Sequence, residues 1–363
     1  MLHCSITLVT SAARGGLNTQ GRMMAQSMAD ILELVRAGKL GDATTAIQRN
    51  LGTAGSQAAP GTVTGMKDIT PKTQMLASGS APKKSTVKPT AARASSWTRH
   101  DGAVPYYLYT PAQAVATAPL IVMLHGCTQS PKDFATGTDM NAAADRIGAH
   151  VIWPEQSRSA NANLCWNWFD PKHQTRGGEA AAIAQVAAYV RTNVVPKASG
   201  IHVAGLSAGG AMAAILGAQY SDVFASVCIH SGLPAGSARD MGSAFAAMNT
   251  GGQARMSVKV PTMVFHGTTD ATVKLANGQT LAADFASTAK PRVRISTING
   301  RRVTVTRSTT DDQSAASEFW QIDGLGHAWS GGNAAGSYAD PKGPSATDEA
   351  IRFFQAVGHG VTD

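Results

Sequence analysis

Apolar side chains recur at helical spacing near the start of the chain. Between residues 20 and 50 they lie three or four positions apart, which is the period of one helix face. Gly38 ends this pattern, and a shorter one follows with Asp42 as its N-cap. We therefore expect a helical N-terminal extension over residues 1–51 that packs on the rest of the chain or on a copy of itself. The first pattern consists of Met24, Met28, Ile31, Leu32 and Val35.

Residues 52–96 have no regular apolar period. Their composition shifts to Gly, Ser, Thr, Pro, Ala and Lys, as in the stretch SGSAPKKSTVKPTAARASS. A segment with so few apolar side chains does not form a core, so the sequence predicts a linker here.

The pattern changes again at Trp97, after which short apolar runs alternate with helical stretches. Continuous apolar runs are typical of strands buried on both faces, and helices between them are typical of parallel sheets. The sequence therefore predicts an α/β domain over residues 97–363, with a mostly parallel central sheet and helices on both faces. The predicted strands are Pro119–His125, His150–Pro154, Ile201–Gly205, Ala225–His230 and Thr262–His266, and the predicted helices are Asn141–Arg146, Glu179–Val194, Gly209–Gln219 and Asp348–Val357.

One pair of segments departs from this alternation. Asn299-Gly300 stands between Arg292–Ile298 and Arg302–Arg307, and Asn-Gly is the strongest short signal for a two-residue hairpin. We expect antiparallel strands at this point, at an edge of the sheet.

Charge changes the picture only for the first quarter of the chain. The formal net charge of +8, from 31 Lys and Arg against 23 Asp and Glu, suggests an anionic partner such as nucleic acid. However, residues 1–97 carry +7 of it, and +5 lies in the linker, where no aromatic side chains interleave the basic ones. We therefore expect a solvated tether and no nucleic-acid partner. Since no run reaches about 18 apolar residues, no transmembrane segment is expected.

The most specific motif is Gly205-Leu206-Ser207-Ala208-Gly209, a G-x-S-x-G box. A predicted buried strand ends at Gly205 and a predicted helix begins just after Ser207. Such a strand–turn–helix exposes a nucleophilic serine, because the small glycines permit a sharp turn. The sequence therefore predicts that Ser207 is a catalytic nucleophile.

A serine hydroxyl needs a base to take its proton, and in this type of site the base follows the serine in the chain. His327 stands in the Gly-rich stretch GLGHAWSGG after the predicted strand Phe319–Ile322. His230 and His266 end buried strands, and His359 lies four residues from the C-terminus. We therefore predict that His327 is the base.

An acid must orient that base. Asp270 follows the predicted strand Thr262–His266, and loops at the carboxyl ends of such strands are where α/β sheets assemble their sites. We predict that Asp270 is the acid. The alternative role for Asp270 is an Asx turn that closes its own loop, and the alternative acids are Asp284, Asp311 and Asp312.

Two backbone amides are expected to bind the oxyanion that forms during acyl transfer. The N–H of Ala208, directly after the nucleophile, is one. The N–H of Cys127, in the stretch LHGCTQS after the first predicted central strand, is the other. The side chain of Cys127 is expected either in a disulfide with Cys165 or as a free buried thiol.

Several motifs in order resemble the short-chain-length poly(3-hydroxybutyrate) depolymerase family, whose members have the α/β-hydrolase fold. The similarity extends from about Trp97 to Phe354 and implies an esterase in which Ser207, Asp270 and His327 form the triad and Cys127 lies at the oxyanion position. The family also holds feruloyl and acetylxylan esterases. The motifs are HGCTQSPKDFATGTDMN, WPEQSRSANANLCWNWF, GLSAGGAMAA, HSGLPAG, VFHGTTDATV and GLGHAWSGG.

The aromatic residues near these motifs have two interpretations. Trp166, Trp168 and Phe169, together with Trp329 two residues after His327, are expected either to line a substrate-binding surface or to pack in the core. Trp329 is the preferred substrate contact, and Asn167 and Gln129 are weaker candidates for hydrogen bonds to substrate.

The sequence as a whole therefore predicts a serine esterase acting on poly(3-hydroxybutyrate) or its oligomers. A feruloyl or acetylxylan esterase is the alternative within the enzyme class, and a non-catalytic protein that coats polymer granules is the alternative outside it. No cofactor and no metal are expected, because no paired His and carboxylate spacing is present.

The resemblance also bears on the compartment. Many family members are secreted behind a signal peptide, but the short apolar stretch Ile6–Val9 follows no basic residues and matches such a peptide only in part. We expect an extracellular protein from the resemblance, with the cytoplasm as the alternative.

Overall fold

The computed structural model describes residues 94–284, 291–309 and 316–358. The chain divides into two units, Met1–Lys84 and Ser85–Asp363, and the fold below is that of the second unit. The predicted helical extension, its self-association and all but the last three residues of the predicted linker lie outside the described residues.

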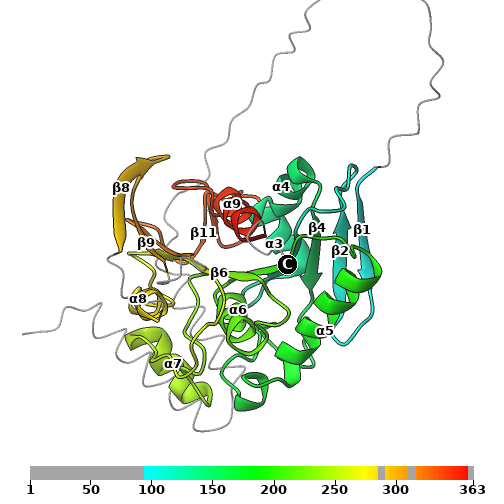
Figure 1. The fold of residues 1–363 in the computed structure, drawn as a ribbon. Helices are drawn as coiled ribbons and strands as arrows, with labels where there is room; N and C mark the ends of the chain where they lie inside the picture. The colour runs from blue at the N-terminus through cyan, green and yellow to red at the C-terminus, as the bar shows by residue number, and fades with distance from the viewer. Residues whose placement is uncertain (1–93, 285–290, 310–315, 359–363) are drawn as a thin grey trace, which may run out of the picture. The chain divides into compact units, whose positions relative to one another are not determined.

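A twisted sheet runs through the described part of the chain (Figure 1). Its strand order is β1-β2-β4-β3-β5-β6-β7-β10-β9-β8. The strands from β4 to β10 in this order pair in parallel, while the pairs at both edges are antiparallel. The strands are β1 (Ser96–His100), β2 (Tyr106–Thr110), β3 (Leu120–Leu124), β4 (His150–Pro154), β5 (Ile201–Leu206), β6 (Ser226–His230), β7 (Thr262–Gly267), β8 (Arg292–Ile298), β9 (Arg301–Thr309) and β10 (Ala316–Ile322).

Helices cover both faces of this sheet (Figure 1). One face carries α3 (Pro131–Thr138), α4 (Met140–Ile147) and α9 (Ala346–Gly358), and the other carries α5 (Gly178–Asn193) and α6 (Ala208–Gln219). The remaining elements are the 3-10 turn η1 (Pro171–His173), α7 (Met241–Thr250), α8 (Ala276–Ala283), and the short parallel pair β11 (Trp329–Ser330) and β12 (Ala339–Asp340).

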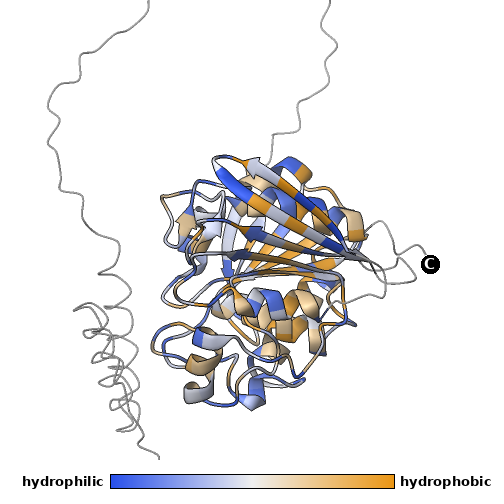
Figure 2. Ribbon diagram, turned by 90° about the vertical axis from the view of Figure 1, so that its left-hand side faces the viewer, coloured by the Kyte–Doolittle hydropathy of each residue, from blue (hydrophilic) through white to orange (hydrophobic). Residues whose placement is uncertain are grey.

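The core forms because apolar side chains project from both faces of the central strands. In β3, Leu120, Val122 and Leu124 pack with the α5 and α6 layer, whereas Ile121 and Met123 pack with the α3, α4 and α9 layer. Figure 2 shows this concentration of apolar residues on the central strands and the helix surfaces that face them. The predicted α/β class and the mostly parallel sheet are confirmed.

The predicted hairpin is also present. Strands β8 and β9 pair antiparallel around Asn299 and Gly300, whose φ angles are 43° and 76°. Positive φ at both positions is what a type I′ turn requires, and Asn and Gly tolerate it best. Among the described residues, no helix is long and apolar enough to cross a membrane.

Candidate active site

Ser207 occupies a sharp turn between β5 and α6. Its backbone angles are φ 57° and ψ −118°, a combination that residues other than glycine adopt only where the surrounding structure enforces it. The Ser207 N–H donates to the carbonyl of His230 at 2.9 Å, and its carbonyl accepts from the N–H of Ala211 at 2.9 Å. These bonds hold the turn at the carboxyl edge of the parallel strands.

The two glycines of the box are required by close backbone packing. A Cβ at Gly209 would lie 2.0 Å from the carbonyl oxygen of Leu124, and a Cβ at Gly205 would lie 2.3 Å from the carbonyl group of Gly209. The first turn of α6 therefore rests directly on the end of β3, and this contact keeps the Ser207 turn against the sheet.

We expect Gly209→Ala to lower the free energy of unfolding by more than the roughly 1–3 kcal/mol typical of overpacked cores, because the added methyl meets rigid backbone. Urea denaturation followed by circular dichroism measures this change. Gly242→Ala in α7 is the control, because its methyl would meet the nearest atom, Asp240 Oδ1, at an ordinary 3.5 Å. Equal stability of the two variants would contradict the packing argument.

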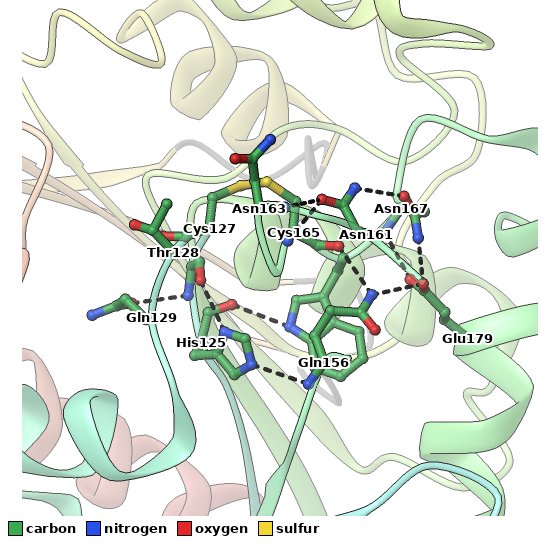
Figure 3. Close-up of a disulfide and its surroundings, with 12 residues drawn as sticks. His125, Cys127, Thr128, Gln129, Gln156, Asn161, Asn163, Cys165, Asn167 and Glu179 are labelled. Carbon is green, nitrogen blue, oxygen red and sulfur yellow. Dashed lines mark hydrogen bonds between the residues drawn. A yellow bond between two sulfur atoms is a disulfide. The ribbon is translucent and has the colours of Figure 1, made fainter. Parts of the chain in front are cut away.

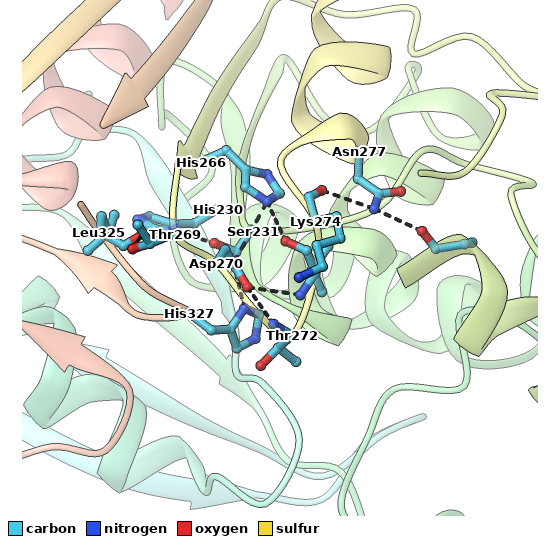
Figure 4. Close-up of polar contacts among 12 residues, drawn as sticks. His230, Ser231, His266, Thr269, Asp270, Thr272, Lys274, Asn277, Leu325 and His327 are labelled. Carbon is cyan, nitrogen blue, oxygen red and sulfur yellow. Dashed lines mark hydrogen bonds and ion pairs between the residues drawn. The ribbon is translucent and has the colours of Figure 1, made fainter. Parts of the chain in front are cut away.

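Asp270 and His327 come from neighbouring strands and meet beside the sheet edge (Figure 4). Asp270 follows β7, and His327 follows β10, which pairs directly with β7. The Nδ1 of His327 lies 2.8 Å from Asp270 Oδ2. The two loops are joined further by Thr269, whose N–H and hydroxyl both donate to the carbonyl of Leu325, at 3.1 and 2.9 Å.

The Asp270 carboxylate is fully buried and stays ionised. Burial by itself raises its pKa, but the charge and hydrogen bond of His327, with the charge of His266 and the Val273 N–H, outweigh burial and lower the pKa to about 2. An ionised carboxylate accepts the Nδ1–H of His327, which leaves the Nε2 of that ring unprotonated when the ring is neutral.

The two roles predicted for Asp270 from the sequence, an Asx turn and the acid of the triad, fall on different oxygens of its carboxylate. Oδ1 accepts from the N–H groups of Thr272 and Val273, at 3.0 and 2.9 Å, as in an Asx turn, while Oδ2 faces His327. Of the alternative acids, Asp284 binds Ser257 and the N–H of Val258. Asp311, Asp312 and the alternative base His359 lie outside the described residues.

The side chain of His327 is 11% exposed, so its ring is mostly buried. Among the described residues, the hydroxyl of Ser207 forms no hydrogen bond with this ring. Catalytic hydrogen bonds of this kind are often long without substrate and tighten when substrate binds.

The loop after β3 lies beside the Ser207 turn. A Cβ at Gly126 would be 3.5 Å from the Cβ of Ser207. Neighbouring groups fix the loop, because the Gly126 N–H donates to Gln129 Oε1 at 2.9 Å and the Thr128 N–H donates to the carbonyl of Asn163 at 2.7 Å. In the described part of the chain, the N–H groups of Cys127 and Ala208 donate no hydrogen bond.

Cys127 and Cys165 form a disulfide, so the free-thiol alternative is wrong for this pair (Figure 3). The disulfide ties the loop after β3 to the segment before α5. That segment is held by Glu179, whose carboxylate accepts from the backbone N–H and the side-chain amide of Asn167 and from the amide of Gln156, at 2.6–2.7 Å.

The prediction that three tryptophans line a substrate-binding surface is wrong, and the alternative, packing in the core, holds for them. Trp166 and Trp329 are 0% and 1% exposed, and Trp168 is 6% exposed, so none offers a face to a polymer. The indole N–H groups of Trp166 and Trp329 donate to the carbonyl of His125 and to the Thr347 hydroxyl. These rings belong to the core because their polar edge finds a buried partner.

The two candidate amides are used within the protein. Asn167 binds Glu179 and accepts from Asn161, and Gln129 binds the Gly126 N–H, Asp133 and Ser337. Their contact with substrate stays a prediction.

Tyr338 lies beside the base, although no motif in the sequence marks it. Its ring packs edge-on against His327 with centroids 6.2 Å apart, and the side chain is 43% exposed. The stretch GSYAD carries no motif, and the contact arises because β11 and β12 pair and return the chain to His327. Among the described residues, no group of three or more His, Cys, Asp or Glu side chains is placed to hold a metal ion.

Comparisons with known proteins find similar sequences among esterases. Residues 104–312 match the family model described as Esterase PHB depolymerase. The chain is 32% identical over 209 residues to poly(3-hydroxyalkanoate) depolymerase C of Paucimonas lemoignei, covering 53% of this chain and 50% of that protein. It is 32% identical over 140 residues to feruloyl esterase B of Thermothelomyces thermophilus, covering 38% and 47%. The chain therefore spans about half the length of these relatives.

A solved structure shows the same fold. The acetyl xylan esterase from Aspergillus awamori matches with a TM-score of 0.55 at 18% identity, covering 72% of this chain and 99% of that one. The predicted α/β-hydrolase fold is confirmed.

Proposed function

Because the chain belongs to the Esterase PHB depolymerase family, we propose that it is a serine esterase that cleaves ester bonds through an acyl-enzyme. The observation that carries this proposal is the 2.8 Å contact between His327 Nδ1 and the buried Asp270 carboxylate, at the same carboxyl edge of the sheet as a serine held in a nucleophile turn. This is the arrangement that converts a weakly reactive hydroxyl into a nucleophile.

In the first half of the reaction, Ser207 Oγ attacks the ester carbonyl and its proton passes to His327 Nε2. The ester C–O bond then breaks, and the alcohol leaves with that proton. Asp270 holds the ring in the tautomer that accepts the proton and stabilises the imidazolium that forms.

In the second half, a water molecule gives a proton to His327 Nε2 and its oxygen attacks the acyl carbon. The bond to Ser207 Oγ breaks, Ser207 regains the proton and the carboxylic acid is released. The N–H groups of Cys127 and Ala208 bind the oxyanion in both halves, which is the largest electrostatic contribution in reactions of this type.

The proposed substrate is poly(3-hydroxybutyrate) or its oligomers. Residues 98–363 carry a net charge of only +1, which suits an uncharged polyester, and one relative is named a poly(3-hydroxyalkanoate) depolymerase. The alternative, a feruloyl or acetylxylan esterase, is favoured by the name of another relative, feruloyl esterase B.

Product analysis separates these substrates. Incubation of the full chain with amorphous poly(3-hydroxybutyrate) should release soluble hydroxybutyrate monomers or oligomers, measured by liquid chromatography. Release of ferulate or acetate from carbohydrate esters, with no product from the polymer, would contradict the proposed substrate.

The disulfide also supports export to an oxidising compartment, because structural disulfides persist there and are rare in the cytosol. Fractionation of the native host tests this proposal. The protein is expected in the culture medium or the periplasm, and recovery in the cytosol with reduced Cys127 and Cys165 would contradict it.

We expect Tyr338→Ala to raise KM for an aromatic or polymeric ester by about five- to tenfold, since an aromatic contact contributes roughly 1 kcal/mol. The reason is that Tyr338 is an exposed ring in contact with His327. Steady-state kinetics measure the change. Tyr189→Ala is the control, because Tyr189 is 58% exposed on α5 and contacts none of the site residues described above. An unchanged KM in Tyr338→Ala would remove Tyr338 from the substrate surface.

A further inference from the structure

His230 is a fully buried histidine that the proposed mechanism does not use. It ends β6, near Asp270, His327 and His266 (Figure 4). A positive charge on its ring would be attracted by Asp270 and repelled by charged His266 and His327. A polar ring at such a depth needs partners for both nitrogens, and those partners show what the ring does.

The two polar ends of His230 connect the nucleophile turn to the loop that carries His327. Its backbone carbonyl accepts from the Ser207 N–H at 2.9 Å. Its ring nitrogen Nε2 accepts from the N–H of Ser330, three residues after His327, at 3.1 Å. One residue therefore binds the Ser207 turn through its backbone and the base-carrying loop through its side chain.

These hydrogen bonds fix both the charge and the tautomer of the ring. Since Nε2 accepts a hydrogen bond, it carries no proton, and the proton of the neutral ring sits on Nδ1, where it points to the hydroxyl of Ser231 at 3.3 Å. Burial favours this neutral form and lowers the pKa of His230 to about 3.

Packing holds the ring in this orientation. Phe265 and Trp329 stack on it, with centroids 5.5 and 5.0 Å away and interplanar angles of 14° and 27°. Ser330 is also held from its other side, because its hydroxyl donates to the carbonyl of Pro344 at 2.8 Å. The end of the loop therefore has one position relative to β6.

We propose that His230 is a positioning residue, which places His327 over Ser207 by holding the Ser330 N–H at a fixed distance from the Ser207 turn. The proposal rests on the proposed function, since it concerns the base of that reaction. His230 touches neither substrate nor the reacting atoms, and it acts through His327 because a displacement of about 1 Å at a reacting group can cost about 10²-fold in rate.

His202 offers a matched control for a histidine that is only part of the core. It is also 0% exposed, it stacks on Phe354 at 4.8 Å and it contacts the Ser226 hydroxyl through Nδ1 at 2.7 Å. It lies near the start of β5, however, whereas Ser207 directly follows the other end of that strand. Replacement of His202 by Phe removes the polar nitrogens of a similar buried ring without touching the loop that carries His327.

The test compares four variants of the full chain on p-nitrophenyl butyrate, with the melting temperature of each measured alongside kcat and KM. His230→Phe keeps a stacked ring but removes the acceptor for the Ser330 N–H, and we expect kcat to fall by about 10- to 100-fold with KM changed less than about threefold. His230→Gln places an amide oxygen near the position of Nε2 and should recover most of that loss. His202→Phe should lower the melting temperature while leaving kcat within about twofold of the native value.

Two outcomes would overturn the proposal for His230. One is that His230→Phe retains native kcat, and the other is that His202→Phe loses as much kcat as His230→Phe. The fourth variant, Ser207→Ala, distinguishes failure of the His230 proposal from failure of the proposed function, because full activity of Ser207→Ala rejects the esterase mechanism itself.

If His230→Phe does not fold, the native protein still provides a test. Imidazole ¹⁵N correlation spectra should show His230 as the Nδ1–H tautomer, and an Nε2–H tautomer would contradict the proposal.

Discussion

Ser207→Ala is expected to lower kcat for a soluble p-nitrophenyl ester by about 10⁶-fold, to the level that the oxyanion amides and substrate binding alone supply. The reason is that Ser207 occupies the nucleophile turn between β5 and α6, and the proposed mechanism makes it the group that the Asp270–His327 pair activates. Thermal stability should change little, because alanine and serine have the same restrictions at a φ of 57°.

Ser237→Ala is a suitable control for this experiment. Among the described residues, the buried hydroxyl of Ser237 has no hydrogen-bond partner, so its loss should leave kcat unchanged. Initial rates with titrated enzyme distinguish the two variants. Retained activity in Ser207→Ala would contradict Ser207 as the nucleophile, whereas a native protein with no ester hydrolysis at all would favour the alternative of a non-catalytic protein that coats polymer granules.

The second large effect is expected in the dependence of stability on pH. Burial lowers the pKa of His125 to about 4 and the pKa values of His202 and His230 to about 3. Burial also lowers the pKa of His266. In the unfolded chain a histidine titrates near 6.5. The folded state thus favours the neutral rings. Their contribution to the free energy of unfolding is complete above about pH 6.5 and is lost as the pH falls toward the pKa values of the folded state.

By linkage, each of the rings of His125, His202 and His230 costs about 2 kcal/mol of stability between pH 7 and pH 5, or about 6 kcal/mol for the three. This is a large share of the roughly 5–15 kcal/mol by which domains are stable. Asp270, with its pKa lowered to about 2, adds a further loss between about pH 4 and pH 2. The protein is therefore expected to be acid-labile.

Urea unfolding at pH 7 and pH 5 measures this effect. His202→Phe removes one of these titrating groups, so the difference between the two pH values should shrink by about 2 kcal/mol in that variant. Equal stability of the native protein at both pH values would show that the buried rings are not held neutral.

The sequence predicted the central strands well because burial on both faces leaves a clear signal. β3 is an unbroken apolar run, and its side chains do divide between the two helix layers. The Asn299-Gly300 turn was equally predictable, since few other residue pairs adopt positive φ twice in succession.

The spatial relation of Asp270 and His327 depends on sheet order, which a single sequence does not encode locally. The two residues are brought together because β10 inserts beside β7, in parallel with it, while the preceding β8–β9 hairpin forms the edge of the same sheet. The sequence predicts that each residue follows a strand, but the 2.8 Å contact between them depends on the register in which β7 and β10 pair.

Nearness to His327 along the sequence does not predict which aromatic rings lie near it in the fold. Trp329 follows His327 by two residues, but it lies in β11, where its ring packs between His230 and Phe134 in the core. Tyr338, eleven residues from His327, is the aromatic ring that contacts the base. Only the β11–β12 pairing produces that contact, and neither short strand has a sequence signal of its own.

The most direct measurement of the central claim is the location of a covalent adduct. The native chain is incubated with a fluorophosphonate, which reacts with activated serines, and the adduct is mapped by tryptic peptide mass spectrometry. The proposed mechanism predicts one adduct per chain, on Ser207, and its disappearance in His327→Ala because the hydroxyl is then no longer activated. An adduct on a different residue, or none on a preparation that hydrolyses esters, would contradict the account.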